Sequence, residues 1–343
     1  MNKIFHQIIF KQPALNKLFY EFEKKVTKNQ NFERIIISGL ARSGTTSLLR
    51  ELVKNDLTCS LTYSSMPLVL APNMQKLLGY FSGNPVKEIE RSHQDGIMIN
   101  TSSSEAFDEV FFQVYEKNGY TFYNHLNEYQ SKHINSYIEF INHFLITNNK
   151  YIYITKNNNH ILRLPEIIES GNFKIFIAFR DPLTHAASLE KQDSIHCNLQ
   201  KKNTFVLDYM NYLGHFEFGI NKKYFNFKNS RVNVLDYESN DFWLAQWINY
   251  YEHIITLTKK YQGINLINFN DWCSKDELLL NKIKFITGIT LNEKDVYLPS
   301  IKPSFNVNEK LLKIADNIFQ ELQMLYKKQL KEIIGMDFTN YKP

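Results

Sequence analysis

The sequence predicts an α/β fold in which a central, mainly parallel sheet is flanked by helices, and three observations predict it. Short runs of β-branched and aromatic residues have the composition of buried strands. The segments between them place apolar residues at i, i+3, i+4 and i+7, which is typical of amphipathic helices. The hydrophobic share of 43% against 22% charged residues is that of a chain with a sizeable core. Strands that alternate with helices favour βαβ units, whose parallel sheet is covered on both faces.

In the first half of the chain, apolar residues at helical spacing predict a helix at 14–26. The β-branched run at 34–38 ends at a glycine and is typical of a buried strand. The polar turn after it leads into a helix at 45–53. Aromatic residues gathered on one face predict two more helices, at 106–116 and 126–145.

Two strands follow in the middle of the chain, at 151–155 and 174–179, where the residues are again β-branched or aromatic. The segment between them is helix-like over 161–170 and closes at Gly171, a residue type common at helix C-termini. The last third is expected to contain one strand, at 264–269, and three helices, at 242–261, 275–287 and 308–333.

The length of 343 residues is enough for one large domain or two modest ones. The sequence has no internal repeat and no linker rich in Pro, Gly or Ser. We therefore expect a single domain over 1–343, with an N-terminal helical extension at 1–30 and a core at 34–330.

The charge balance and the cysteines exclude several classes of protein. The 40 Lys and Arg against 35 Asp and Glu leave a net charge of +5, which permits an anionic ligand but is far from the dense basic face of nucleic-acid-binding proteins. Cys59, Cys197 and Cys273 are odd in number and far apart, so neither a disulfide framework nor a cysteine zinc site is expected. This usage fits a reducing cytoplasm, and no apolar stretch approaches the length of a membrane helix.

The turn after the first strand carries the most informative motif. Gly39 and Gly44 have the spacing of the phosphate-binding loop of ATPases and GTPases, but Thr45 stands where that loop has lysine. A helix follows at once, and the unpaired N–H groups of a helix start favour an anion. Arg42 adds a fixed positive charge whose fork geometry suits phosphate oxygens. The turn predicts a phosphate cradle, with a turn that binds nothing as the alternative, and the missing lysine disfavours ordinary ATP or GTP hydrolysis.

The run Arg42-Ser-Gly-Thr-Thr resembles the 5′-phosphosulfate loop of sulfotransferases that use 3′-phosphoadenosine-5′-phosphosulfate (PAPS). Arginine at this position matches the branch that includes tyrosylprotein and many bacterial sulfotransferases, and the chain looks like an uncharacterised bacterial branch. The resemblance implies a P-loop-like sulfotransferase fold, PAPS as cosubstrate and Arg42 as an aid to sulfuryl transfer. It implies that six residues hold the 5′-phosphosulfate: Arg42, Ser43, Gly44, Thr45, Thr46 and Ser47.

The turn after the strand at 174–179 carries a second motif. Arg180 ends the strand, a sharp Asp-Pro turn follows, and Ser188 lies about two helical turns further on. A guanidinium and a hydroxyl so placed can hold one phosphate from two sides, whereas the alternative is an arginine paired with Asp181 and a serine that faces solvent. The stretch resembles the family's 3′-phosphate motif, which implies that Arg180 and Ser188 bind the 3′-phosphate of PAPS.

Two lysines complete the contacts that the resemblance implies. Lys156 follows the strand at 151–155, where sulfotransferases have a lysine at the bridging region of the phosphosulfate. A mobile point charge suits the charge that develops on the leaving phosphate, and the alternative is a surface lysine beside three solvated asparagines. Lys302, in Ser-Ile-Lys-Pro, resembles a lysine that one branch brings to the 3′-phosphate, and a plain surface lysine is equally open.

The catalytic base is not marked by the usual pattern. Many sulfotransferases have a glutamate soon after the first loop, but residues 57–87 contain neither Asp nor Glu. His93 is the expected base, because an imidazole titrates near neutrality and can take the proton of an acceptor hydroxyl. Glu90 and Asp95 are the alternatives.

The resemblance implies an acceptor pocket lined by residues 63–73 and 93–96, whose aromatic and amide side chains suit a carbohydrate or another polyhydroxyl acceptor. The expected function is transfer of a sulfuryl group from PAPS to a hydroxyl of a carbohydrate or glycoconjugate. The product would be adenosine 3′,5′-bisphosphate (PAP), and no metal or nucleic acid is required. An ATP-dependent phosphotransferase and a non-enzymatic anion-binding module remain as alternatives, and the acceptor and the oligomeric state stay open.

Overall fold

The computed structural model describes residues 3–24, 31–80, 89–90, 98–228, 230–291 and 307–334. The strands are β1 (Glu33–Ser38), β2 (Thr58–Cys59), β3 (Ile89–Glu90), β4 (Met98–Ile99), β5 (His125–Asn127), β6 (Ile152–Lys156), β7 (Lys174–Phe179), β8 (Tyr224–Asn226) and β9 (Ile264–Asn268). The α-helices are α1 (Lys3–Lys11), α2 (Ala14–Glu23), α3 (Thr45–Leu52), α4 (Pro72–Tyr80), α5 (Glu109–Tyr120), α6 (Ile134–Asn148), α7 (Leu164–Glu169), α8 (Pro182–Lys202), α9 (Thr204–Leu213), α10 (Ser239–Lys260), α11 (Phe269–Ser274), α12 (Glu277–Thr287) and α13 (Glu309–Ile334). The 3-10 helices are η1 (Tyr63–Ser65), η2 (Asn158–Arg163) and η3 (Val234–Asp236).

The central sheet confirms the predicted α/β architecture. Its strand order is β2-β6-β1-β7-β9, and every neighbouring pair in it is parallel. Most residues of β1, β6 and β7 are buried, because other elements cover both faces of the sheet. The four long strands of this sheet are those that the sequence predicts at 34–38, 151–155, 174–179 and 264–269.

The register aligns the carboxyl ends of the central strands. Ile37 of β1 lies opposite Lys156 of β6 and Phe176 of β7. The chain leaves β1 towards β2 on one side of the sheet, and it leaves β7 towards β9 on the other. In an open parallel sheet, the place where such connections diverge forms a crevice outside the carboxyl ends, and ligands bind there. In this chain the connections diverge between the ends of β1 and β7.

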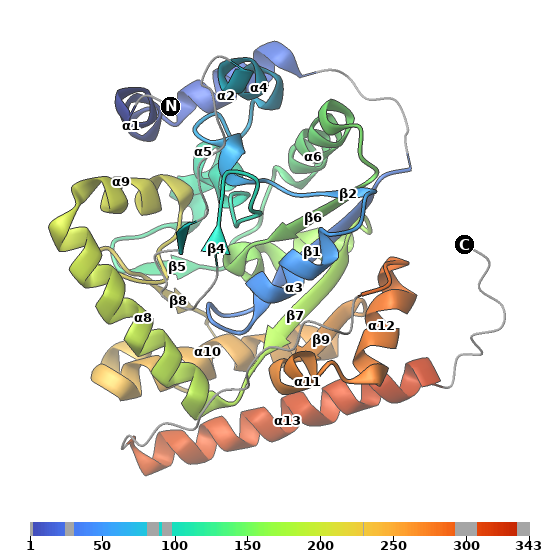
Figure 1. The fold of residues 1–343 in the computed structure, drawn as a ribbon. Coiled ribbons are helices and arrows are strands. Elements are labelled where there is room, and N and C mark those ends of the chain that lie inside the picture. Colours follow the sequence, from blue (N-terminus) through green and yellow to red (C-terminus); the bar gives the residue numbers. More distant parts are fainter. Residues whose placement is uncertain are drawn as a thin grey trace.

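The helices enclose the sheet and share one core. α3 packs against β1 and β6, α6 against β6, and α13 against β9 and α10. Figure 1 shows α13 running along one end of the molecule beside α10 and α11, while α1, α2 and α4 lie at the opposite end. A single hydrophobic cluster extends from Ile9 in α1 to Leu330 in α13. Among the described residues, no helix combines the length and the apolar composition that crossing a membrane requires.

Several predicted helices differ from the structure at their beginnings. The helix expected at 126–145 is wrong in its first part, because residues 125–127 form β5 and α6 begins only at Ile134. β5 pairs with β8, a segment far along the chain, and this pairing overrides the local helical pattern. The helix expected at 106–116 begins at Glu109 instead.

Candidate functional site

The loop after β1 is shaped by two glycines. Gly39 has a φ of 149°, and a Cβ there would lie 2.6 Å from Ser43 Oγ and 2.7 Å from the carbonyl oxygen of Ala178 in β7. Gly44 has a φ of 94°, and a Cβ there would lie 2.5 Å from the ring of Phe269. Neither position accepts a side chain without displacing its neighbours, so the loop packs closely against both β7 and the residue after β9.

Arg42 is held in an unusual conformation by the segment that follows β7. Its φ of 71° lies in the left-handed region, which is uncommon for a residue with a side chain and persists only where the surroundings impose it. Arg180 Nη1 donates to the Arg42 carbonyl at 3.2 Å, and His185 Nε2 donates to the Ala41 carbonyl at 2.7 Å. The turn after β7 therefore fixes the loop after β1.

The two motifs that the sequence predicts to bind phosphate lie together at the carboxyl ends of β1 and β7. Arg42 Nε donates to Ser188 Oγ at 3.3 Å, which joins the first motif to the second. Asp181 serves as the cap of α8, since its Oδ1 accepts from the Thr184 N–H at 2.9 Å. The structure thus brings Arg42, Arg180 and Ser188 together, although the two arginines are 138 residues apart in the sequence.

Arg180 lies in surroundings that oppose its charge. Burial and the neighbouring Arg42 lower its pKa to about 10. Its guanidinium carbon is 4.8 Å from the ring centroid of Phe269, and its buried Nε has no hydrogen-bond partner within the described part of the chain. Two arginines this close, one of them with an unpaired buried N–H group, form a site that a bound anion would stabilise.

His185 is a residue that the sequence reasoning missed. It is fully buried, and this burial together with the nearby Arg180 lowers its pKa to about 3. The imidazole is therefore neutral at pH 7 and donates its proton on Nε2 to the Ala41 carbonyl. One helical turn separates His185 from Ser188, so both lie on the same face of α8. The separation of three residues between His185 and Ser188 is the sequence feature that could have identified His185 as part of the site.

The first turn of α3 follows the same loop. The helix begins at Thr45, directly after Gly44, so the N–H groups of residues 45–47 have no partner within the helix. The Ser47 hydroxyl donates to the Gly44 carbonyl at 2.7 Å and accepts from Trp272 Nε1 at 2.8 Å. The Ser47 hydroxyl therefore links α3 to α11. Because this hydroxyl is already bonded, Ser47 can bind an anion through its backbone N–H.

Lys156 ends β6 and is paired with a carboxylate. Its Nζ lies 3.1 Å from Glu105 Oε1, and the two side chains are 12% and 9% exposed. The asparagines at 157–159 are buried, and Asn157 Nδ2 donates to Glu109 Oε2 at 2.7 Å. The alternative of a surface lysine beside solvated asparagines is therefore wrong, because these amides are used inside the protein.

The side chains of four expected site residues are not among those that the structure describes. His93, Asp95 and Lys302 lie outside the described residues. Glu90 belongs to β3, which pairs with β4 in a small antiparallel sheet, and only its backbone is described. The expected roles of these four residues stay predictions.

A hydroxyl-lined pocket opens beside β2, the edge strand of the central sheet. It holds about 1070 Å³ of empty space, open solvent included. Six hydroxyl side chains line it: Ser60, Thr62, Ser64, Ser65, Ser102 and Ser104. Lys76 and Lys150 also line it, so the pocket is rich in hydrogen-bond donors. Part of the segment 63–73, expected at an acceptor pocket, contributes to this lining.

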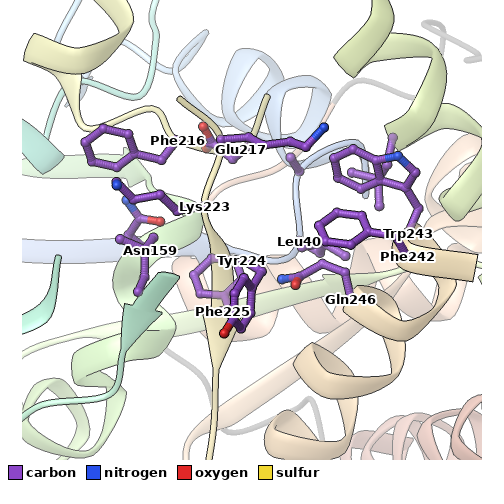
Figure 2. Close-up of a pocket in the computed structure, with 14 residues that line it drawn as sticks. Leu40, Asn159, Phe216, Glu217, Lys223, Tyr224, Phe225, Phe242, Trp243 and Gln246 are labelled. Carbon is purple, nitrogen blue, oxygen red and sulfur yellow. The ribbon is translucent and has the colours of Figure 1, made fainter. Parts of the chain in front are cut away.

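A second pocket, shown in Figure 2, lies beside residues 40–41 at the start of the first loop. Its aromatic lining comes from five residues: Phe216, Tyr224, Phe225, Phe242 and Trp243. Two of its charged groups are paired inside the protein, since Glu217 accepts from Asn158 Nδ2 at 2.7 Å and Lys222 lies 2.6 Å from Asp193 Oδ2. These pairs indicate a structural role for the polar groups of this pocket.

No family model matches the sequence, and no curated protein matches it. Among solved structures, the chain is similar to sulfotransferase STF1 from Mycobacterium tuberculosis H37Rv, with 12% identity, a TM-score of 0.41, and coverage of 96% of this chain and 83% of that one. It is similar to sulfotransferase STF9 from Mycobacterium avium, with 10% identity, a TM-score of 0.39, and coverage of 95% and 80%. It is also similar to a sulfotransferase from Alicyclobacillus acidocaldarius, with 12% identity, a TM-score of 0.40, and coverage of 90% and 100%.

Proposed function

We propose that this protein transfers a sulfuryl group from PAPS to a hydroxyl of an acceptor, with residues 1–343 acting as one domain. The observation that carries the proposal is the direct contact of the two motifs, in which Arg180 donates to the Arg42 carbonyl and Arg42 donates to Ser188. PAPS carries phosphate oxygens at two separate positions of its ribose, whereas ATP carries them in one chain. Two guanidinium groups from two different turns therefore suit PAPS better.

In the proposal, each of the two motifs binds one phosphate-bearing end of PAPS. Residues 42–47 hold the 5′-phosphosulfate through Arg42, through the N–H groups of the first turn of α3 and through the hydroxyls of Ser43, Thr45 and Thr46. Arg180 and Ser188, with Lys302 as a further contact, hold the 3′-phosphate and so select PAPS over ATP. Binding exchanges the 3.3 Å contact between Arg42 and Ser188 for contacts with the two phosphate groups. The Nε of Arg180, which has no hydrogen-bond partner among the described residues, and the lowered pKa of this side chain support the assignment, because an anion would offset both.

Lys156 is proposed to stabilise the oxygen that leaves with PAP. Its ammonium is a compact charge on a flexible stem, and it ends the strand next to β1. Positive side chains at the transferring group take the role that Mg²⁺ has in kinases, so we expect no metal requirement. His93, with Glu90 and Asp95 as alternatives, is the base that the sequence pattern suggests.

A carbohydrate or glycoconjugate is the proposed acceptor. The pocket beside β2 supports this, because its six hydroxyl side chains and two lysines can hydrogen-bond a molecule that carries many hydroxyl groups. The hydroxyl-bearing lining residues come from two stretches of the chain, residues 60–65 with η1 and residues 102–104.

Sulfuryl transfer by the full chain tests the proposal. Radiolabelled PAPS and a panel of neutral mono- and disaccharides are incubated with the protein, and labelled saccharide sulfate is the expected product. Arg42→Ala should abolish the transfer, whereas Arg231→Ala is the matched control, since Arg231 is an exposed arginine paired with Glu252. Release of phosphate from ATP with magnesium, and no transfer from PAPS, would favour a phosphotransferase. Steep salt dependence of anion binding without any nucleotide requirement would favour a binding module.

A further inference from the structure

Glu105 reaches the carboxyl edge of the central sheet through an antiparallel contact between two segments. The Tyr63 N–H donates to the Ser103 carbonyl at 3.2 Å, and the Glu105 N–H donates to the Leu61 carbonyl at 3.1 Å. These bonds hold the segment that ends in Glu105 against the chain that leaves β2. They bring the carboxylate to Lys156, 51 residues further along the sequence.

The Glu105 carboxylate is oriented by two donors. Its Oε1 accepts from Lys156 Nζ at 3.1 Å and from the Ala106 N–H at 3.0 Å. Lys156 lies opposite Ile37, which is one residue before the end of β1, and the phosphate loop starts directly after that end. The carboxylate is therefore next to the lysine that faces the reacting end of the nucleotide in the proposed function.

The same segment also lines the hydroxyl-rich pocket. Thr62 and Ser104 form an isolated antiparallel bridge, and both line the pocket beside β2. Ser104 directly precedes Glu105, so a residue that lines the pocket and the partner of Lys156 are neighbours in the chain. A group that accepts a proton from the acceptor must reach the acceptor hydroxyl close to the transferring group. The Glu105 carboxylate lies 3.1 Å from Lys156, and its residue directly follows the pocket-lining Ser104.

We infer that the Glu105 carboxylate is the catalytic base that accepts the proton of the acceptor hydroxyl, an assignment that rests on the proposed function. In this step the acceptor oxygen forms a bond to sulfur, and the bond between sulfur and the 5′-phosphate oxygen breaks. The electron pair of the broken bond leaves with that phosphate oxygen, which gives PAP. The hydroxyl proton moves to Glu105, which becomes a neutral carboxyl group.

The pairing with Lys156 couples the two ends of the reaction. An ammonium close to a carboxyl group favours its ionised form, which is the form that a base needs. When Glu105 takes the proton, it no longer attracts the ammonium of Lys156. This happens as negative charge develops on the leaving oxygen, so the charge of Lys156 becomes available where it stabilises the transition state. Residues 57–87, where many sulfotransferases have a glutamate, contain no acidic residue, and Glu105 supplies a carboxylate in its place.

The test compares Glu105→Gln with the wild-type chain in the transfer of radiolabelled sulfuryl groups to the saccharide panel. We expect kcat to fall by about 10²- to 10⁴-fold, the usual range for loss of a general base. Calorimetry with PAP should show an affinity within threefold of the wild type. Glu33→Gln is the matched control, since Glu33 forms a surface pair with Lys174 at 2.7 Å, and it should leave kcat unchanged.

A second acceptor separates a base from a residue that only positions Lys156. The hydroxyl of 4-nitrophenol is largely ionised above neutral pH and needs no base, so Glu105→Gln should keep its rate within threefold of the wild type. Added formate should restore part of the saccharide activity of Glu105→Ala. Equal losses with both acceptors and no rescue by formate would overturn the assignment. So would full saccharide activity of Glu105→Gln together with a complete loss in His93→Gln.

A second pair of variants keeps the inference testable if Glu105→Gln does not fold. Glu105→Asp keeps a carboxylate at the site, so we expect it to retain more saccharide activity than Glu105→Ala. Equal activities of these two variants would overturn the inference. A wild-type chain that neither binds PAP nor transfers label would overturn the proposed function itself, and the inference with it. Failure of the inference alone leaves PAP binding and wild-type transfer intact.

Discussion

At the scale of single residues, Arg180 joins two turns of the sheet. It donates to the backbone of the first loop at Arg42, and its guanidinium lies over Phe269, the residue after β9. Burial beside another arginine destabilises its charged form, which is why its pKa is lowered to about 10. A dianionic phosphate group at this position would offset both effects.

Arg180→Ala should therefore weaken PAP binding by about 2–5 kcal/mol, the range found when one partner of a buried charged pair is truncated. Isothermal titration calorimetry of the variant and the wild type measures the difference. AMP lacks the 3′-phosphate, so its affinity should change little. Equal losses for PAP and AMP would contradict the assignment of Arg180 to the 3′-phosphate.

Gly44→Ala should lower the free energy of unfolding by more than backbone strain alone. The left-handed conformation is less favourable by about 1–2 kcal/mol for a residue with a side chain, and the new Cβ would also lie 2.5 Å from the Phe269 ring. Gly171→Ala is the matched control, because its φ is 66° and nothing lies within 4 Å of the added Cβ. Chemical denaturation measures both, and equal losses would contradict the close packing of the loop on Phe269.

At the scale of elements, the parts of the site that have local signals are predictable from the sequence. β1 and β7 are β-branched or aromatic runs, and the turns after them carry Gly39, Arg42 and Arg180 within a few residues of the strand ends. Strand, turn and helix start follow one another in the chain, so their residue types and spacing suffice. The order of parallel strands then brings the turns together.

Other parts of the site depend on contacts that no local pattern marks. Glu105 reaches Lys156 only because its segment pairs with the chain after β2. β5 looks helical in sequence and becomes a strand because β8 lies beside it. His185 has a local spacing, but its role depends on a carbonyl of the other loop, at Ala41. Long-range packing determines the positions of Glu105 and His185 and the strand conformation of β5. A single sequence does not show which distant segments pack together.

α12 is attached to its neighbours by a buried lysine whose charge the surroundings disfavour. Lys282 Nζ donates to the Leu266 carbonyl of β9 at 3.1 Å and to Gln329 Oε1 of α13 at 2.8 Å. Burial lowers its pKa to about 7, with Glu332 acting weakly in the opposite direction. In the unfolded chain, the lysine pKa is about 10.4.

This difference predicts a dependence of stability on pH. Between about pH 7 and pH 10 the unfolded state binds more protons at Lys282, so the free energy of unfolding rises with pH in this window. The contribution changes by at most about 1.4 kcal/mol per pH unit. Denaturation of Lys282→Met and of the wild type at several pH values measures it. The wild type should gain stability relative to the variant as the pH rises, and parallel curves would contradict the prediction.

At the scale of the whole molecule, the site is a property of the sheet rather than of one motif. β1, β6, β7 and β9 end at the same edge and supply the phosphate loop, Lys156, Arg180 and Phe269. The turns after β1 and β7 lie where the connections from these two strands diverge, which is where ligands bind in an open parallel sheet. The net charge of +5 is mild, so the proposed recognition of an anion would depend on these few partly buried cations and not on the overall field.

The most direct test of the central claim is a calorimetric titration of the full chain with PAP and, separately, with AMP. The two ligands differ only in the 3′-phosphate, which the crevice between β1 and β7 is proposed to bind through Arg180 and Ser188. We predict that PAP binds at least about 30-fold more tightly, which corresponds to about 2 kcal/mol. Equal affinities for PAP and AMP would contradict the claim that this chain holds a 3′-phosphorylated nucleotide.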